Sequence, residues 1–280
     1  MTKDIILKAE DLYYSYDDNN TYSLKGLSLE IERGKKVAFM GANGAGKSTF
    51  FLTLNGINRI SKGKLSIDGK ELGYSKKELI DIRSKVGIVF QDPDNQLFSA
   101  SVRQEISFGA LNMGMTEEEA AVAVDEMIET LEITPFKDRP THALSGGQKK
   151  QVSIADVMVM NPEIVILDEP AAALDPKHTV IVNKIINMMV DKGITVLIST
   201  HDVNFAYEWA DEVVVIHDGR TLRHGKPDEV FSDKEMLEMT NLAQPAVLEM
   251  FNSLVERGLL AKDLTPPKNL KILEEYISLI

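Results

Sequence analysis

Short runs of aliphatic residues recur along the chain and are separated by stretches with helical spacing. The runs are KVAFM in the region 35–40, KLSID at 64–68, VGIVF at 86–90, IVILD at 164–168, ITVLIST at 194–200 and EVVVIHDG at 212–219. Three of them are nearly continuous aliphatic runs, which is typical of strands buried on both faces of a parallel sheet. Because helical patterns lie between the runs, the sequence predicts an α/β core with crossover connections.

The aliphatic runs stop between Asp92 and Met160, and the pattern there becomes helical. Thr116 and Glu119 have the spacing of a capping box. Behind them, apolar residues recur at helical intervals: Ala120, Val124, Met127, Ile128 and Leu131. We therefore expect a helical insertion in the α/β core over about residues 92–160.

A different pattern begins after about Thr240. Pro245 stands in the first turn of a predicted helix, and Gly258 stands where that helix should stop. The segment LTPPKN then interrupts the chain, and LKILEEYISLI predicts a final amphipathic helix. Residues 241–280 are too few for an independent domain, so we expect a helical extension that either caps the core or contacts a partner.

Composition narrows the possible functions. The 280 residues carry a net charge of −12, with 31 basic and 43 acidic residues, which argues against a nucleic-acid partner. The chain has no cysteine, which excludes disulfides, thiolate metal sites and cysteine nucleophiles. It also shows neither a signal-peptide pattern nor a run approaching the roughly 20 apolar residues that span a bilayer. We expect a cytoplasmic protein.

A glycine-rich loop carries the strongest chemical signal. GANGAGKST at 41–49 matches G-x-x-x-x-G-K-[ST] between the apolar VAFM and the helical TFFLTLNG. Its backbone N–H groups can wrap phosphates, Lys47 supplies a positive charge to the β- and γ-phosphates, and Ser48 offers a hydroxyl to Mg²⁺. The predicted nucleotide-binding residues are Gly41, Asn43, Gly44, Ala45, Gly46, Lys47, Ser48 and Thr49.

Polar side chains follow the ends of three predicted strands, where α/β sheets present their ligands. Asp168 can hold the Mg²⁺ shell, and Glu169 points to the other side as a general base for the water that attacks the γ-phosphate. Gln91 could coordinate Mg²⁺ or that water, and His201 should lie near the phosphates. The remaining histidines lack metal-ligand spacing and are expected to have no special role: His142, His178, His217 and His224.

The start of a second predicted helix has the features of an anion-binding site. Ser145, Gly146 and Gly147 precede QKKQVSIADVMVM, which predicts a helix. A small polar residue and glycines at a helix start can hold an anion through free N–H groups and the helix dipole. The chain thus carries two phosphate-facing helix starts that are far apart in sequence.

These motifs, in this order, resemble the ATP-binding-cassette (ABC) ATPases over about residues 3–240, and LSGGQ at 144–148 is similar to the family's signature sequence. The resemblance implies a P-loop NTPase (RecA-like) core with an antiparallel β subdomain and a helical signature subdomain, in a domain over residues 1–240. It also implies ATP and Mg²⁺ as cofactors. Subunits of this family pair head to tail, so three residues should contact ATP held by a partner: Ser145, Gly147 and Gln148.

The resemblance assigns further roles by position. Tyr16 in YYSY matches the aromatic residue that stacks on adenine, with Tyr13 and Tyr14 as alternative registers. Glu169 resembles the catalytic carboxylate, and His201 resembles the switch residue that contacts the γ-phosphate. Gln91 matches the loop that links the ATP state to a membrane partner. In the ALDP loop, one residue should reach across the dimer, namely Asp175.

A few positions depart from the family pattern: Ala171, Gln151 and Asp156. None has a direct chemical role, so the departures bear on the fine tuning of the rate.

A closer resemblance comes from QDPDNQLF at 91–98, which is similar to the ATPases of energy-coupling-factor and cobalt-type importers. It implies an ATP-hydrolysing subunit on the cytoplasmic face of the membrane that drives import of cobalt, nickel or a vitamin. Asp92 and Asp94 would suit basic coupling helices of an integral membrane partner, although DPD is also a turn sequence. The intact hydrolytic motifs favour a homodimer over a heterodimer, and residues 241–280 would help dimerisation.

Other functions explain less of the sequence. Another ABC transporter, including an exporter, would use the same hydrolytic residues. A soluble ABC protein that acts on ribosomes or DNA usually carries two cassettes or a long coiled coil, and neither is present here. A nucleotide kinase leaves LSGGQ and the THD sequence at 200–202 unexplained.

Overall fold

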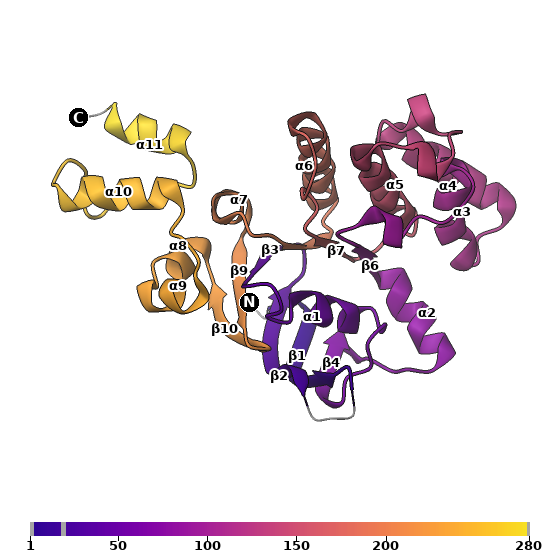
Figure 1. Ribbon diagram of the computed structural model, residues 1–280, viewed down its shortest axis with the longest axis horizontal. Coiled ribbons are helices and arrows are strands. Elements are labelled where there is room, and N and C mark those ends of the chain that lie inside the picture. Colours follow the sequence, from indigo (N-terminus) through magenta and orange to yellow (C-terminus); the bar gives the residue numbers. More distant parts are fainter. Residues whose placement is uncertain (1–2, 18–20, 279–280) are drawn as a thin grey trace.

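The computed structural model describes residues 3–17 and 21–278, and a mixed six-stranded sheet forms its centre (Figure 1). The strand order is β10-β9-β3-β8-β7-β6, in which only β10 is antiparallel to its neighbour. The strands are β3 (Lys36–Met40), β6 (Val86–Val89), β7 (Ile164–Asp168), β8 (Thr195–Ser199), β9 (Glu212–His217) and β10 (Arg220–Gly225). Five of the six aliphatic runs therefore form the predicted parallel core, in which β7 and β8 are buried almost throughout.

A second sheet is antiparallel, with the order β2-β1-β4-β5. Its strands are β1 (Ile5–Ser15), β2 (Tyr22–Glu32), β4 (Lys62–Ile67) and β5 (Lys70–Glu71). The run KLSID lies in β4, but β1 and β2 came from no predicted run, because their buried positions alternate with exposed ones. This sheet and the central one share a core with α1 (Lys47–Leu54), in which Phe39, Phe50 and Phe51 are fully buried. Burial of each phenylalanine contributes about 1.5–3 kcal/mol.

The region predicted to be helical contains no strand over residues 92–160, all of which the structure describes. Thr116 and Glu119 form the predicted capping box, and Val124, Ile128 and Val152 join one core. Gln151, a departure from the family pattern, donates to Leu131 O at 3.2 Å. The helical elements between β5 and β7 are α2 (Lys76–Lys85), η1 (Pro93–Asn95), α3 (Val102–Asn112), α4 (Glu117–Thr130), η2 (Thr134–Phe136), η3 (Thr141–Ala143) and α5 (Gly146–Met158).

The C-terminal helices lie at the opposite end of the molecule from α3, α4 and α5 (Figure 1). Leu248 and Phe251 share a core with Tyr207 and Phe231. Pro245 was predicted in the first turn but is the N-cap, because its extended ψ of 135° precedes the helix. The remaining helices are α6 (Pro176–Asp191), α7 (Val203–Trp209), α8 (Pro227–Phe231), α9 (Lys234–Thr240), α10 (Ala246–Glu256) and α11 (Leu270–Ile277).

Gly258 follows α10 with a left-handed φ of 71°, as its predicted stop position requires. Within residues 3–17 and 21–278, no helix combines the length and apolarity that a membrane span needs.

Candidate functional site

The glycine-rich loop connects the carboxyl end of β3 to the start of α1. Gly41 and Gly46 have left-handed φ angles of 138° and 111°, and a Cβ at Gly41 would lie 2.1 Å from the Ile216 carbonyl oxygen. Only glycine fits such a position. Gly46 is the N-cap of α1 and has no side chain to cap the helix, so the N–H groups of the first turn are available to a ligand.

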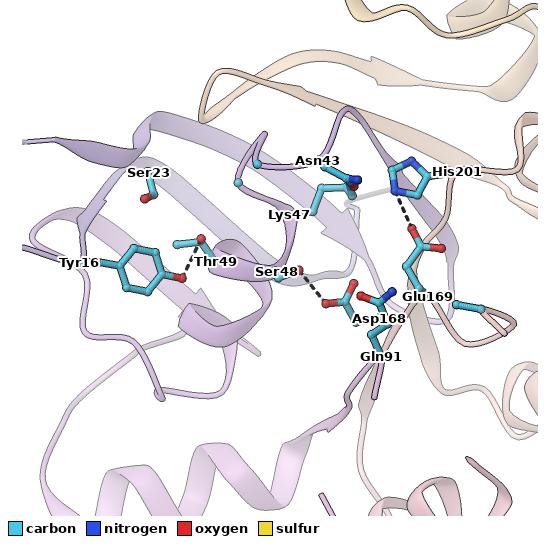
Figure 2. A pocket seen from close by; sticks show the side chains of 13 residues that line it. Tyr16, Ser23, Asn43, Lys47, Ser48, Thr49, Gln91, Asp168, Glu169 and His201 are labelled. Carbon is cyan, nitrogen blue, oxygen red and sulfur yellow. Dashed lines mark hydrogen bonds and ion pairs between the residues drawn. The ribbon is translucent and has the colours of Figure 1, made fainter. Parts of the chain in front are cut away.

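The loop opens into a cleft of about 440 Å³. Its side chains come from the loop, from β2 and from segments at or just beyond the carboxyl ends of β1, β6, β7 and β8 (Figure 2). Gly41 and Ala45 belong to the loop but do not line the cleft in the described part of the chain. The lining residues are Tyr16, Ser23, Asn43, Gly44, Gly46, Lys47, Ser48, Thr49, Gln91, Asp168, Glu169, Ala172 and His201.

Lys47 lies in this cleft with only 7% of its surface exposed. Its ammonium group donates to Gly41 O at 2.7 Å and to Ala42 O at 3.2 Å. Burial lowers the pKa of Lys47, and the nearby carboxylates of Glu169 and Asp168 partly oppose that effect. A buried cation over a phosphate-sized cradle is suited to an anionic ligand.

Asp168 is the last residue of β7 and Glu169 follows it, and Ser199, the last residue of β8, contacts both. The two strands place Asp168 and Ser199 in register. Ser199 Oγ donates to Asp168 Oδ1 and accepts from the Glu169 N–H at 2.9 Å. Asp168 Oδ2 in turn accepts from Ser48 Oγ at 2.7 Å (Figure 2). Ser199 was missed by the sequence analysis, although its position at the end of a predicted strand was a usable signal.

Glu169 is held in a strained conformation, with a left-handed φ of 46°. Its Oε1 lies 3.1 Å from His201 Nε2, but the orientation is too poor for a hydrogen bond, and this buried oxygen has no hydrogen-bond partner among the described residues. Burial raises the pKa of Glu169, while His201 and Lys47 act in the opposite direction. An unsatisfied carboxylate oxygen with a raised pKa fits a proton acceptor for a bound water.

Tyr16 is the tyrosine of YYSY that lines the cleft, and its hydroxyl lies 3.0 Å from Thr49 Oγ1. Tyr14 packs edge-on against it, with ring centroids 4.9 Å apart. Tyr13 instead packs against Tyr22, at 5.4 Å. The geometry thus favours Tyr16 over Tyr13 and Tyr14 as the tyrosine available to stack on a nucleobase.

The signature segment lies outside this cleft. Ser145 is the N-cap of α5, and its reciprocal hydrogen bonds with Gln148 form a capping box. The helix therefore begins at Gly146, earlier than predicted, because the capping box draws both glycines into the first turn. A Cβ at Gly147 would lie 2.1 Å from the ring of His178, whose Nδ1 is 2.6 Å from Asp175 Oδ2. The expectation that His178 has no special role misses this contact between two motifs.

The sequence model of the ABC transporter family matches residues 24–172. An energy-coupling factor transporter ATP-binding protein, EcfA3 of Clostridium perfringens, is 46% identical over 91% of this chain and 90% of its own length. The chain belongs to the ABC transporter family. The ABC ATPase fold and ATP hydrolysis predicted from the sequence are thereby confirmed.

Other relatives of this ABC ATPase extend the likeness. EcfA of Methanocaldococcus jannaschii is 44% identical over 89% of each chain. The structure of cbiO1 from Clostridium perfringens, described as part of the ABC transporter complex cbiONQ, has a TM-score of 0.73 at 45% identity, covering 91% of this chain and 100% of that one. The cassette MJ0796, a dimer in a post-hydrolysis state bound to ADP and Pi, has a TM-score of 0.72 at 27% identity, with coverage of 79% and 98%.

The cleft of this ABC ATPase also suits a divalent cation. Ser48 Oγ, the Asp168 carboxylate and the Gln91 amide oxygen are hard donors of the kind that Mg²⁺ prefers. Clusters of three or more histidine or acidic residues that could enclose a metal on their own are absent from the described residues. The donor set therefore fits a cation shared with bound phosphates better than an all-protein metal site.

Proposed function

We propose that this ABC ATPase is the energy-coupling subunit of a membrane importer for a transition-metal ion, cobalt or nickel, or for a vitamin. The observation that carries the proposal is its likeness to energy-coupling factor ATP-binding proteins, which reaches far beyond residues 24–172 to 91% of the chain. The cobalt alternative draws support from the name of the cbiO1 structure. Such a subunit supplies the energy of ATP hydrolysis, and its membrane partners determine which substrate is transported.

In the proposed reaction, the loop at 41–49 binds the phosphates of ATP and Tyr16 stacks on adenine. Ser48, Asp168 and Gln91 would hold Mg²⁺, which neutralises phosphate charge when bound. Glu169 accepts a proton from the water that attacks the γ-phosphate, and His201 contacts that phosphate. The unsatisfied Oε1 of Glu169 supports this assignment.

Each ATP site is completed by a second copy of the chain. In this arrangement, Ser145, Gly147 and Gln148 of one subunit contact the γ-phosphate held by the other, and Asp175 reaches across the interface. The exposed position of Ser145 and Gly146, outside the cleft of their own chain, supports this division. Two ATP molecules close the dimer, and their hydrolysis reopens it.

The membrane partner is expected to dock on the segment at 91–98. Asp92 caps the turn η1, so the predicted turn and an exposed acidic surface coexist there. Phe98 is 67% exposed and packs edge-on against Phe108, with centroids 4.8 Å apart. An exposed aromatic pair beside the exposed carboxylate of Asp92 suits a basic amphipathic helix on the cytoplasmic face of the membrane, while the Asp94 carboxylate already pairs with Lys149.

The C-terminal extension is proposed to strengthen the dimer. Several large apolar side chains on or beside α10 and α11 remain exposed, which supports a contact surface: Met250, Leu259, Leu270 and Ile277.

Co-purification from native membranes in mild detergent tests this function. We expect a stoichiometric polytopic membrane protein, and a small accompanying membrane subunit would indicate the substrate. Phe98→Asp should release these partners, whereas Val122→Asp, at an equally exposed site on α4, should retain them. Recovery of soluble partners alone would overturn the importer proposal.

The hydrolytic assignment predicts that Glu169→Gln lowers ATP turnover by at least about 100-fold, because the amide cannot accept the proton from water. ATP binding should persist, so the variant should accumulate an ATP-dependent dimer that light scattering detects. A variant that binds ATP but stays monomeric at saturating ATP would contradict the paired-subunit mechanism.

A further inference from the structure

Lys150 is a buried cation on the signature helix α5. Only 1% of its surface is exposed, and its ammonium group donates to Phe90 O at 2.7 Å and to Gln91 O at 2.8 Å. No ion pair in the described part of the chain includes it. Burial lowers the pKa of Lys150 to about 8, so the ammonium form still predominates at pH 7. A buried charge is costly unless its partners are well placed, and here they are two consecutive backbone carbonyls.

These two carbonyls flank one residue. The Phe90 carbonyl belongs to the peptide plane that precedes the Cα of Gln91, and the Gln91 carbonyl belongs to the plane that follows it. Because each peptide unit is planar, fixing both oxygens fixes the backbone on either side of Gln91 and thereby the origin of its side chain. Gln91 and Asp168 line the same cleft (Figure 2).

Neighbouring contacts hold the same segment against α5. Lys149 Nζ lies 2.6 Å from Asp94 Oδ1, and Gln96 Nε2 donates to Ser153 O at 2.9 Å. The segment after β6 is therefore attached to α5 at several positions. Of these contacts, those of Lys150 are the ones that reach a residue lining the cleft, namely Gln91.

We propose that Lys150 is a positioning residue that holds Gln91 where its amide can complete the Mg²⁺ site of bound ATP. This inference rests on the proposed role of Gln91 as a metal ligand. It also implies that Gln91 is tied to the helix whose first turn, at Ser145, faces the partner subunit's nucleotide.

The test is the effect of Mg²⁺ on ATP affinity, measured at equilibrium with a fluorescent ATP analogue on the full chain. For each variant, the affinity ratio with and without Mg²⁺ is compared with that of the unmodified protein. Lys150→Met should lower this ratio about tenfold. Its ATP affinity in EDTA should stay within twofold of that of the unmodified protein, because only the Mg²⁺-dependent part of ATP binding is disturbed. Lys149→Met removes the same charge one residue earlier, from a partly exposed ion pair, and should leave the ratio unchanged.

A double variant decides whether Lys150 acts through Gln91. Adding Lys150→Met to Gln91→Ala should cause no further loss in the ratio, since residues that act through one another are not additive. An unchanged ratio in Lys150→Met, an equal loss in EDTA, or additive losses in the double variant would overturn the proposal. If Lys150→Met does not fold, Lys150→Gln is measured by the same criteria.

The Gln91→Ala variant alone separates this inference from the proposed function. If Gln91→Ala does not lower the ratio, the metal role of Gln91 and the inference both fail. If Gln91→Ala lowers the ratio and Lys150→Met does not, the role of Lys150 fails alone.

Discussion

Two helix starts in this protein combine glycine with a small hydroxyl residue, yet they present their first turns differently. The start of α1 follows Gly46, which has a left-handed φ of 111° and no side chain to cap the helix. The start of α5 follows Ser145, whose hydroxyl accepts from the Gln148 N–H at 3.3 Å, while the Gln148 amide oxygen accepts from the Ser145 N–H at 3.1 Å. The first start has no side-chain cap, whereas at the second Ser145 caps the Gln148 N–H within its own chain.

The two helix starts also differ in the residues that surround them. The first turn of α1 faces a cleft that contains Lys47, Asp168 and Glu169. Ser145 and Gly146 are exposed at the surface and lie outside that cleft. An anion-binding pattern in a sequence therefore does not show whether one chain supplies all the residues of the site. Here one helix start lines a cleft of its own chain, whereas the other is exposed, and in the proposed function it supplies a contact to a second chain.

The largest expected effect separates ATP binding by a single chain from ATP-dependent dimerisation. Lys47→Ala should weaken ATP binding to the isolated chain about 100-fold, roughly 2.7 kcal/mol, because the charge over the phosphates is lost. Ser145→Arg should change that affinity less than threefold and yet abolish ATP-dependent dimerisation. Calorimetry gives the first quantity and light scattering the second. Loss of monomer binding in Ser145→Arg would place the signature in its own chain's site.

Paired alanine substitutions sharpen the comparison through stability. Gly41→Ala should destabilise the fold by about 2–4 kcal/mol, because a left-handed φ and a backbone contact at 2.1 Å both oppose a Cβ. A Cβ at Gly146 meets no described atom within 4 Å, so Gly146→Ala should be neutral or stabilise the helix by up to about 1 kcal/mol. Urea unfolding measures both. A large loss of stability in Gly146→Ala would mean that the space around Gly146 is more crowded than the structure indicates.

The smallest expected effect lies at the far end of α5, where burial raises the pKa of Asp156 to about 7 from 3.8. Gln96 opposes this shift by hydrogen bonding, and Glu105 on α3 adds to it. Because the native state binds this proton more tightly, stability should fall as pH rises from about 4 to 7 and should then level off.

Asp156→Asn should therefore raise the Tm by several degrees at pH 8 and by little at pH 4.5, since 1 kcal/mol moves Tm by roughly 2–4 °C in chains of 150–250 residues. The exposed Asp138→Asn is the matched control. Equal changes at the two pH values would show that Asp156 is ionised in the native state.

The parallel core and the cleft were predictable because continuous aliphatic runs and a fixed loop motif are local signals. The strands β1 and β2 were not, because one face of each is exposed and their register depends on pairing with distant segments. Ser199, Lys150 and His178 contact residues that lie 31, 60 and 31 positions away, respectively, and no local spacing encodes those contacts. Most residues that line the cleft were thus predictable, except Ser23 and Ala172, whereas the residues that contact them from distant segments required the fold.

The division of each ATP site between two chains is tested most directly by mixing two inactive variants. In a Glu169→Gln background, Lys47→Ala and Ser145→Arg chains should each fail to dimerise with ATP. In the mixed dimer, both defects fall in one site and the other site has an intact loop and an intact signature, so ATP-dependent heterodimers should appear. If mixing restores no dimer while each variant remains folded, the signature does not complete the partner's site and the account is wrong.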